Sequence, residues 1–267
     1  MVAPARSANM TVMVRAVEKA GRALVRDFGE LEKLQVTKKG VGDFVTHADY
    51  KSEKILFEEL SKARPDYGFL LEEGGERKGK NPDYVWVIDP VDGTTNFMHG
   101  IPFWAISLAL VYKGRPIAGI VFNPINDEMF WAERGQGAYM NAERLRVSGR
   151  RELDEAVVYT HCYFSGRRPV GLPQAQFKKI VANIAAQRNL GCASLALAYV
   201  AAGKIEAFVE RGQKAWDVAA GMLIVQEAGG YVTTHDGAKD KLPYTDNILA
   251  ANPKIHAKLL AILNDKE

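Results

Sequence analysis

The sequence predicts an α/β protein with an antiparallel sheet in its first half and a mostly parallel sheet in its second half. Before about residue 148, short β-rich runs follow one another with "KGR" and "NPIND" between them, a pattern typical of an antiparallel meander. Beyond residue 148, strand-like runs alternate with helical patterns. The sequence contains no evident linker, so residues 1–148 and 149–267 are expected to form one unit.

The first half is predicted to open with helices. Apolar residues at helical spacing predict an amphipathic helix over 10–28. The polar, glycine-containing stretch 37–45 predicts a loop. Thr46 and Asp49 then form a capping pattern that opens a second helix, and this helix is expected to end before Pro65.

The remaining elements are predicted from short apolar runs and from helix start and stop signals. In the first half the predicted strands cover 68–71, 84–88, 103–112, 116–122 and 128–132. In the second half the predicted order is strand 156–160, helix 174–187, helix 194–203, strand 205–210, helix 217–228, strand 247–252 and a helix beginning at Pro253.

Composition sets limits on the class of protein. The chain has 267 residues, of which 47% are hydrophobic and 25% charged, the balance of a soluble globular protein. Its net charge is +3 and the basic residues are dispersed, which argues little for nucleic acid. Cys162 and Cys192 form no disulfide framework. With no signal peptide and no apolar run long enough to span a membrane, a cytoplasmic protein is expected.

The stretch 86–97, "WVIDPVDGTTNF", places two aspartates at the end of a buried strand. Asp89 and Asp92 are three residues apart, so their side chains converge only if the chain bends between them, as Pro90 favours. Carboxylates held this close repel each other, and a low dielectric strengthens the repulsion. A divalent cation with oxygen ligands, such as Mg²⁺, would offset it. The pair therefore predicts a magnesium site.

The residues after this pair suit phosphate chemistry. Gly93 lets the backbone approach a ligand closely, and a helical turn starting at "TTNF" would offer N–H groups to a phosphate. The Thr94 hydroxyl can orient a water molecule. The alternative is an ordinary turn, with Asp89 as its cap and Asp92-Gly93 as its turn dipeptide. The sequence shows no Ser, Cys or His nucleophile arrangement, which favours metal-assisted hydrolysis by water.

Two long motifs resemble the signatures of the inositol monophosphatase family, in the form of its bacterial inositol-1-monophosphatases. They are "WVIDPVDGTTNF" (86–97) and "WDVAAGMLIVQEAGG" (216–230). Supporting segments occur in order at 42–49, 72–76 and 191–203. The resemblance covers essentially the whole chain, and it implies a layered α-β-α-β-α sandwich of the sugar phosphatase type.

The resemblance also assigns roles to residues. The ligands that it implies for two to three Mg²⁺ ions are Glu72, Asp89, the carbonyl of Val91, Asp92 and Asp217. It implies that Thr94 and Asp49 position the attacking water and that Glu72 takes part in catalysis by contacting the third ion. The substrate contacts that it implies are the backbone N–H groups of Gly93 and Thr94, the backbone of Ala193, and Glu210.

Some of these residues also have structural interpretations. Asp49 could serve only as the capping partner of Thr46, and Asp217 could be the N-cap of its helix. Glu210 could be an ordinary surface residue at a strand end. The segment 161–171, "HCYFSGRRPVG", departs from the "GFPF"-like sequence of many bacterial members, and Arg167 and Arg168 within it could contact a second phosphate or form a solvated loop.

The activity that follows is Mg²⁺-dependent hydrolysis of myo-inositol monophosphate, or of a similar small sugar phosphate, by metal-activated water. The resemblance further implies lithium sensitivity and a homodimer. Fructose 1,6-bisphosphate, a 3′-phosphonucleotide and histidinol phosphate are alternative substrates. Some bacterial relatives also act as accessory factors in transcription and RNA processing, so an additional role with nucleic acid or RNA polymerase is a further alternative.

Overall fold

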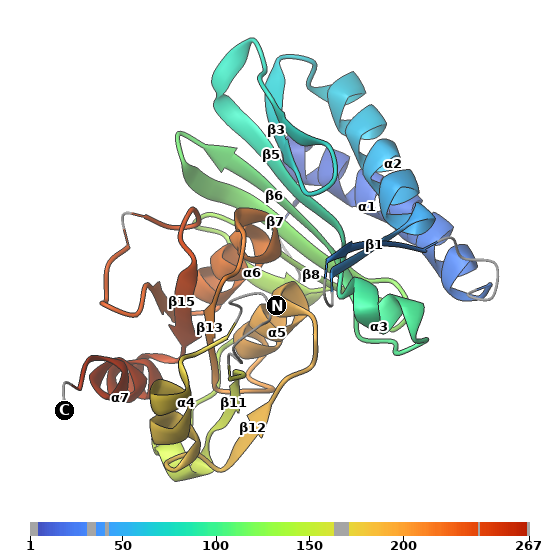
Figure 1. Cartoon of the computed structure of the whole chain (residues 1–267). Coiled ribbons are helices and arrows are strands. Elements are labelled where there is room, and N and C mark those ends of the chain that lie inside the picture. Colours follow the sequence, from blue (N-terminus) through green and yellow to red (C-terminus); the bar gives the residue numbers. More distant parts are fainter. Residues whose placement is uncertain (1–4, 31–35, 41–42, 163–170, 240, 266–267) are drawn as a thin grey trace.

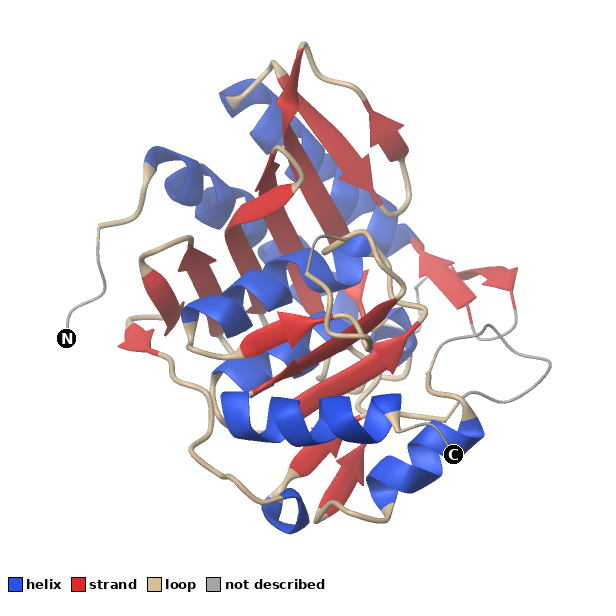
Figure 2. Cartoon of the chain, turned by 90° about the vertical axis from the view of Figure 1, so that its left-hand side faces the viewer, coloured by secondary structure: helices blue, strands red, loops and turns tan. Residues whose placement is uncertain are grey.

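The protein is stacked as helix–sheet–helix–sheet–helix, and both large sheets are covered by helices on each face (Figures 1 and 2). The computed structural model describes residues 5–30, 36–40, 43–162, 171–239 and 241–265. The predicted fold class and layered sandwich are confirmed.

The first outer layer consists of α1 (Ala8–Phe28) and α2 (His47–Ala63). Ser7 caps α1 by accepting a hydrogen bond from the Met10 N–H at 3.1 Å, and the predicted capping box opens α2. The apolar stripe of each helix is buried against one face of the first sheet. Both predicted helices are therefore confirmed.

The first sheet has the strand order β10-β9-β8-β7-β6-β5-β3-β4. Its strands are β3 (Tyr67–Leu71), β4 (Gly75–Arg77), β5 (Asn81–Asp92), β6 (Ala105–Tyr112), β7 (Arg115–Asn123), β8 (Glu128–Glu133), β9 (Gly137–Met140) and β10 (Glu143–Arg144). All of its pairings are antiparallel except that of β3 with β5, as the predicted meander requires. The interior strand β5 carries the acidic motif at its end.

The middle layer is formed by α5 (Ala193–Ala201) and α6 (Ala215–Glu227), which lie between the two sheets (Figure 1). Most of their residues are buried, because each helix carries apolar or small side chains on all of its faces. One apolar cluster includes residues of both sheets and both helices. The two sequence halves therefore share a core.

The second sheet has the order β12-β11-β13-β15-β14. Two of its four described pairings are parallel and two are antiparallel, so the mostly parallel sheet predicted for the second half is wrong and the sheet is mixed. Its strands are β11 (Val157–Tyr159), β12 (Ala186–Arg188), β13 (Ala207–Arg211), β14 (Tyr231–Thr233) and β15 (Asn247–Ala251). Strand β11 runs parallel to β12 and β13, whereas β15 is antiparallel to β13 and β14. The helices α4 (Gln174–Val181) and α7 (Pro253–Asn264) cover its outer face, and a 3₁₀ turn (Leu153–Glu155) precedes β11.

Two local predictions were wrong. The stretch 37–45 is not a loop, because β1 (Val36–Gly40) and β2 (Asp43–Thr46) pair as an antiparallel hairpin. The helix predicted over 174–187 ends at residue 181, and β12 continues the sheet at the edge of β11. In both places backbone pairing with a neighbouring strand overrides the local sequence signal.

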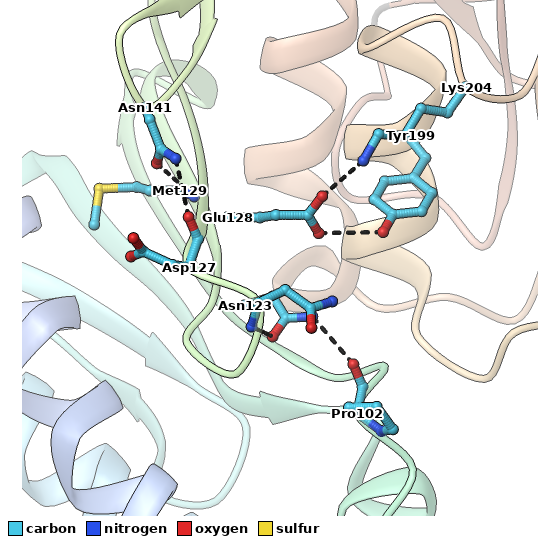
Figure 3. Close-up of polar contacts among 9 residues, drawn as sticks. Pro102, Asn123, Asp127, Glu128, Met129, Asn141, Tyr199 and Lys204 are labelled. Carbon is cyan, nitrogen blue, oxygen red and sulfur yellow. Dashed lines mark hydrogen bonds and ion pairs between the residues drawn. The ribbon is translucent and has the colours of Figure 1, made fainter.

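Polar contacts fix the turn between β7 and β8 to its surroundings (Figure 3). Glu128 accepts hydrogen bonds from Tyr199 Oη at 3.1 Å and Lys204 Nζ at 2.6 Å, at the end of α5. Asn123 Nδ2 donates to the Pro102 carbonyl at 3.2 Å. Since the opposite end of α5 reaches the acidic motif, these contacts help to hold that helix against the first sheet.

Within the described part of the chain, every helix is too short or too polar to cross a lipid bilayer.

Candidate active site

The acidic motif lies where β5 bends away from its neighbour. Asp89 pairs with Ser107 and Asp92 with Ala105, so β5 contains one more residue than β6 between these pairs. This irregularity is the predicted bend. Asp89 Oδ1 accepts a hydrogen bond from the Val91 N–H at 2.9 Å. The bend therefore brings Asp89 and Asp92 to one pocket.

Gly93 occupies a position that favours glycine. Its φ of +95° is left-handed, and it is the N-cap of the short helix α3 (Thr94–Met98). A Cβ at this position would lie 3.2 Å from the carbonyl oxygens of both Phe103 and Gly191. The backbone at Gly93 thus passes close to Gly191, in the segment that precedes α5. Asn96 reinforces this approach by donating to the Leu190 carbonyl at 2.7 Å.

The predicted pair of Thr94 and Asp49 is in contact. Thr94 Oγ1 lies 3.2 Å from Asp49 Oδ1 and 3.1 Å from the Val91 carbonyl oxygen, and it can donate to either. Asp49 Oδ2 accepts from the Thr46 N–H at 3.0 Å. Burial raises the pKa of Asp49 to about 6, although its hydrogen bonds with Thr46 and Thr94 oppose this. Asp49 therefore caps α2 and also contacts Thr94.

Asp92 is held by the N-terminus of α5. Its Oδ2 accepts hydrogen bonds from the Ser194 N–H at 2.6 Å and from Cys192 Sγ at 3.2 Å. Burial raises the pKa of Asp92, while the hydrogen bonds from Ser194, Cys192 and Ala193 act in the opposite direction. Ala193 also lines the pocket. The packing of α5 thus positions Asp92 and Ala193, both of which were predicted to belong to the site.

Glu72 and Asp217 reach the same pocket from distant segments. Glu72 follows β3, and its N–H donates to the Ile88 carbonyl of β5 at 3.2 Å. Asp217 is the third residue of α6, where its Oδ2 accepts from the Lys214 N–H at 2.7 Å. Asp217 is therefore a capping-box partner rather than the N-cap itself.

The pocket has a volume of about 320 Å³. Its lining residues are Glu72, Asp89, Val91, Asp92, Gly93, Thr94, Thr95, Tyr159, His161, Asn189, Gly191, Ala193, Gly212, Gln213, Lys214, Trp216 and Asp217. Two of the residues predicted for the site do not line it. Asp49 lies behind Thr94, and Glu210 lies behind His161.

The electrostatics of the pocket suit a cation. Burial raises the pKa of Asp89 well above its usual range, and the carboxylates of Glu72, Asp92 and Asp217 raise it further. A hard divalent ion would offset this repulsion, and the carboxylate and carbonyl oxygens of the pocket are the type of ligand that such an ion prefers. Within the described ranges, however, no three His, Cys, Asp or Glu side chains are arranged to hold a metal ion. The predicted ligand set therefore stays a prediction.

Glu210 is fully buried on β13 and does not face the pocket. Its Oε1 lies 2.9 Å from Nδ1 of His161, which does line the pocket. Burial raises the pKa of Glu210 to about 7, and hydrogen bonding to His161 limits the rise. The predicted direct contact of Glu210 with substrate therefore stays a prediction.

Sequence reasoning did not assign His161, Tyr159, Lys214 and Trp216 to the site. One signal was available for His161, which directly follows the predicted strand 156–160, because ligands of open α/β sheets bind at the carboxyl ends of strands. Arg167 and Arg168, considered as contacts for a second phosphate, lie outside the described residues.

The layered fold and a pocket lined by carboxylates and a threonine are typical of sugar-phosphate phosphatases. The model of the inositol monophosphatase family matches residues 7–267. The chain belongs to the inositol monophosphatase family, and the predicted family and phosphatase activity are confirmed.

Individual relatives agree with this assignment. The chain is 49% identical over 256 residues to an inositol-1-monophosphatase of Mesorhizobium japonicum, with 96% of each chain covered. It is 40% identical over 251 residues to the Nus factor SuhB of Pasteurella multocida, with 94% of each covered. The crystal structure of the extragenic suppressor protein SuhB from Bartonella henselae superposes with a TM-score of 0.90 at 48% identity, over 98% of this chain and 100% of that one.

Proposed function

We propose that the protein is a Mg²⁺-dependent phosphomonoesterase that hydrolyses myo-inositol monophosphate or a similar small sugar phosphate. The observation that carries this proposal is the meeting of Glu72, Asp89, Asp92 and Asp217 in one pocket. The inositol-1-monophosphatase name of relatives at about half identity supports the substrate class.

The residues of the chain divide the chemistry between them. Thr94 and Asp49 orient the water, because their contact aligns one hydroxyl and one carboxylate beside the acidic cluster. The N–H groups of Gly93 and Thr94 bind phosphate oxygens at the start of α3. The Val91 carbonyl and the carboxylates of Glu72, Asp89, Asp92 and Asp217 would hold two to three Mg²⁺ ions. When bound, Mg²⁺ would lower the pKa of the water and stabilise the leaving group.

Binding of the metal would require small adjustments of side chains. Asp92 and Asp217 each use Oδ2 to accept a backbone N–H, from Ser194 and Lys214 respectively. These bonds fix each carboxylate at a helix N-terminus while leaving the group in the pocket wall.

The test is phosphate release from myo-inositol 1-phosphate by purified protein with Mg²⁺ or with excess chelator. We expect chelation and Asp92→Asn each to abolish nearly all activity, because the charge of Asp92 serves the metal. The matched control is Asp83→Asn, at the opposite end of the same strand, where the carboxylate is 45% exposed and pairs with Lys113. Full turnover in chelator, or equal losses in both variants, would refute the proposal.

A second candidate is an accessory role in transcription, which the similarity to the Nus factor SuhB of Pasteurella multocida favours. Retention of RNA polymerase by the immobilised protein, undiminished by Asp92→Asn, would support it; no retention would count against it. The homodimer and the cytoplasmic location stay predictions, and sedimentation equilibrium tests the first of them.

A further inference from the structure

Helix α2 buries three polar side chains on one face. They belong to Asp49, Ser52 and Glu53, which lie three and four residues apart and are therefore neighbours on the helix surface. Their exposed fractions are 1%, 0% and 6%. Because buried polar groups are normally hydrogen-bonded, the partners of these side chains indicate what the polar face of α2 is for.

Ser52 and Glu53 bind two different segments that carry acidic residues of the pocket. Ser52 Oγ donates a hydrogen bond to the Pro90 carbonyl at 3.1 Å, within the bend of β5. Glu53 Oε2 accepts a hydrogen bond from the Glu73 N–H at 2.9 Å, in the turn between β3 and β4. The same turn of α2 is therefore attached both to the bend and to this second segment.

The Glu53 carboxylate lies close to the backbone of the turn between β3 and β4. Burial raises the pKa of Glu53, and its hydrogen bonds with the backbone of Glu73 and Gly74 oppose this rise. A Cβ at position 74 would lie 2.9 Å from Glu53 Oε1, so the glycine leaves the space that the carboxylate occupies. On β4, the Arg77 guanidinium lies 4.4 Å from the ring centroid of Phe57, which also belongs to α2. Two contacts thus hold this hairpin against α2.

The turn carries Glu72, whose side chain reaches the acidic cluster. Burial raises the pKa of Asp89, and the neighbouring carboxylates, including the hydrogen-bonded Glu72, raise it further. Like charges held this close repel each other, so the segments that carry them need attachments outside the cluster. Glu53 does not line the pocket, and its bond to the turn backbone is such an attachment.

We propose that Glu53 is a positioning residue that holds the turn carrying Glu72 against α2, and thereby keeps Glu72 beside the bend of β5. This inference rests on the proposed function, because it takes Glu72 and Asp89 to be metal-binding residues. Carboxylates that are already held in place bind a cation more tightly, since the cost of ordering them is met on folding. Glu53 therefore acts on metal affinity through the backbone, without contacting metal or substrate.

The first test measures Mg²⁺ binding to the metal-free protein by isothermal titration calorimetry, with no substrate present. We expect Glu53→Ala to raise the Kd for Mg²⁺ about tenfold, the usual effect of losing a group that supports a metal ligand. Glu53→Gln keeps one acceptor oxygen for the Glu73 N–H and should raise it less. At saturating Mg²⁺, kcat should stay within about threefold of the wild-type value, because the metal restores the arrangement. A wild-type Kd in folded Glu53→Ala would overturn the proposal. A wild-type protein that binds no Mg²⁺ would instead refute the proposed function.

The second test displaces the Glu53 carboxylate without deleting it. In Gly74→Ala the added Cβ would lie 2.9 Å from both Glu53 Oε1 and Leu71 Cδ1, which are ends of side chains that can move. This variant should therefore fold and should also raise the Kd for Mg²⁺. In the Glu53→Ala background the Cβ has room, so Gly74→Ala should have no further effect there. Additive losses in the double variant would mean that Glu53 does not hold the turn, and would overturn the proposal.

The matched control is Glu206→Ala, in the second sequence half. Glu206 is 1% exposed, and like Glu53 it accepts a backbone N–H, that of Val157 at 2.7 Å, but it also binds Arg150 and lies outside the pocket wall. This variant should lower the melting temperature while leaving the Kd for Mg²⁺ unchanged. A rise in Kd as large as that of Glu53→Ala would show that loss of any buried glutamate is sufficient, and would overturn the positioning role.

Discussion

Removal of the Thr94 hydroxyl should separate water positioning from binding. Thr94→Ala deletes the contacts of Oγ1 with Asp49 at 3.2 Å and with the Val91 carbonyl at 3.1 Å, and it removes no carboxylate. Misplacement of an attacking group costs on the order of 10²-fold in rate, equivalent to about 2.7 kcal/mol. One lost hydrogen bond costs about 1 kcal/mol of folding stability, so the folded state should persist.

The assay is steady-state phosphate release with saturating Mg²⁺, together with thermal unfolding. For Thr94→Ala we expect kcat to fall about 10²-fold and KM to change by less than about threefold, since the phosphate contacts that we propose are backbone N–H groups and metal. Thr94→Ser keeps a hydroxyl and should recover most of kcat. Thr11→Ala is the control, because the Thr11 hydroxyl also binds a backbone carbonyl, at 2.9 Å, but far from the pocket. An unchanged kcat with a raised KM would make Thr94 a binding residue and refute the reasoning.

Three further predictions concern the framework of the site. Gly93→Ala should lower stability by about 1–2 kcal/mol, because alanine is strained at a φ of +95°, and should also reduce kcat; a melting curve and an activity assay check both effects. Asn96→Ala removes 2.7 Å bonds to the carbonyls of Phe103 and Leu190, so urea unfolding should show a loss of about 1–3 kcal/mol. Burial lowers the pKa of His235 from 6.5 to about 4. As the pH falls, the imidazole is therefore protonated in the unfolded state at a higher pH than in the folded state. The free energy of unfolding should decrease as the pH falls from about 6.5 towards 4. Urea unfolding at pH 7.5 and pH 5 should show a smaller pH effect in His235→Gln than in the wild type.

Much of the fold could be predicted because periodicity and capping act locally. The helix over 10–28 and the capping box at Thr46 are set by residues within a few positions of each other, and the structure reproduces both. The hairpin of β1 and β2 could not be predicted from its polar composition, because its strands are stabilised by each other's backbone. The strand β12 was missed for the same reason. The sequence pattern predicted that the preceding helix extends to residue 187, whereas residues 186–188 pair with β11.

The pocket that holds the predicted site residues could be anticipated where those residues are concentrated in one segment. Asp89, Asp92 and Thr94 lie within a single motif, and the bend between the two aspartates followed from their spacing and from Pro90. Asp217 was assigned through the family resemblance, since a helix-capping aspartate has the same local pattern with or without a ligand.

His161 was missed for a different reason. Its contact with Glu210 depends on the register between β11 and β13 and on the absence of a side chain at Gly171, and the residues next to His161 in the sequence show neither of these.

The close packing of segments at the pocket gives the site one further property. A Cβ at position 93 would lie 3.2 Å from the carbonyl oxygen of Gly191, and a Cβ at position 191 would lie 3.1 Å from Nδ2 of Asn96. The turn at Gly191 therefore packs closely against both the Gly93 backbone and the Asn96 side-chain amide. The turn at Gly93 carries Asp92 and Thr94, while the turn at Gly191 leads into the helix whose N-terminus binds Asp92. Because interiors packed this closely transmit small displacements, a shift of either turn moves the acidic cluster and the N–H groups of Gly93 and Thr94 together. Substitutions at these glycines should therefore change metal affinity and kcat in parallel, although neither residue supplies a carboxylate.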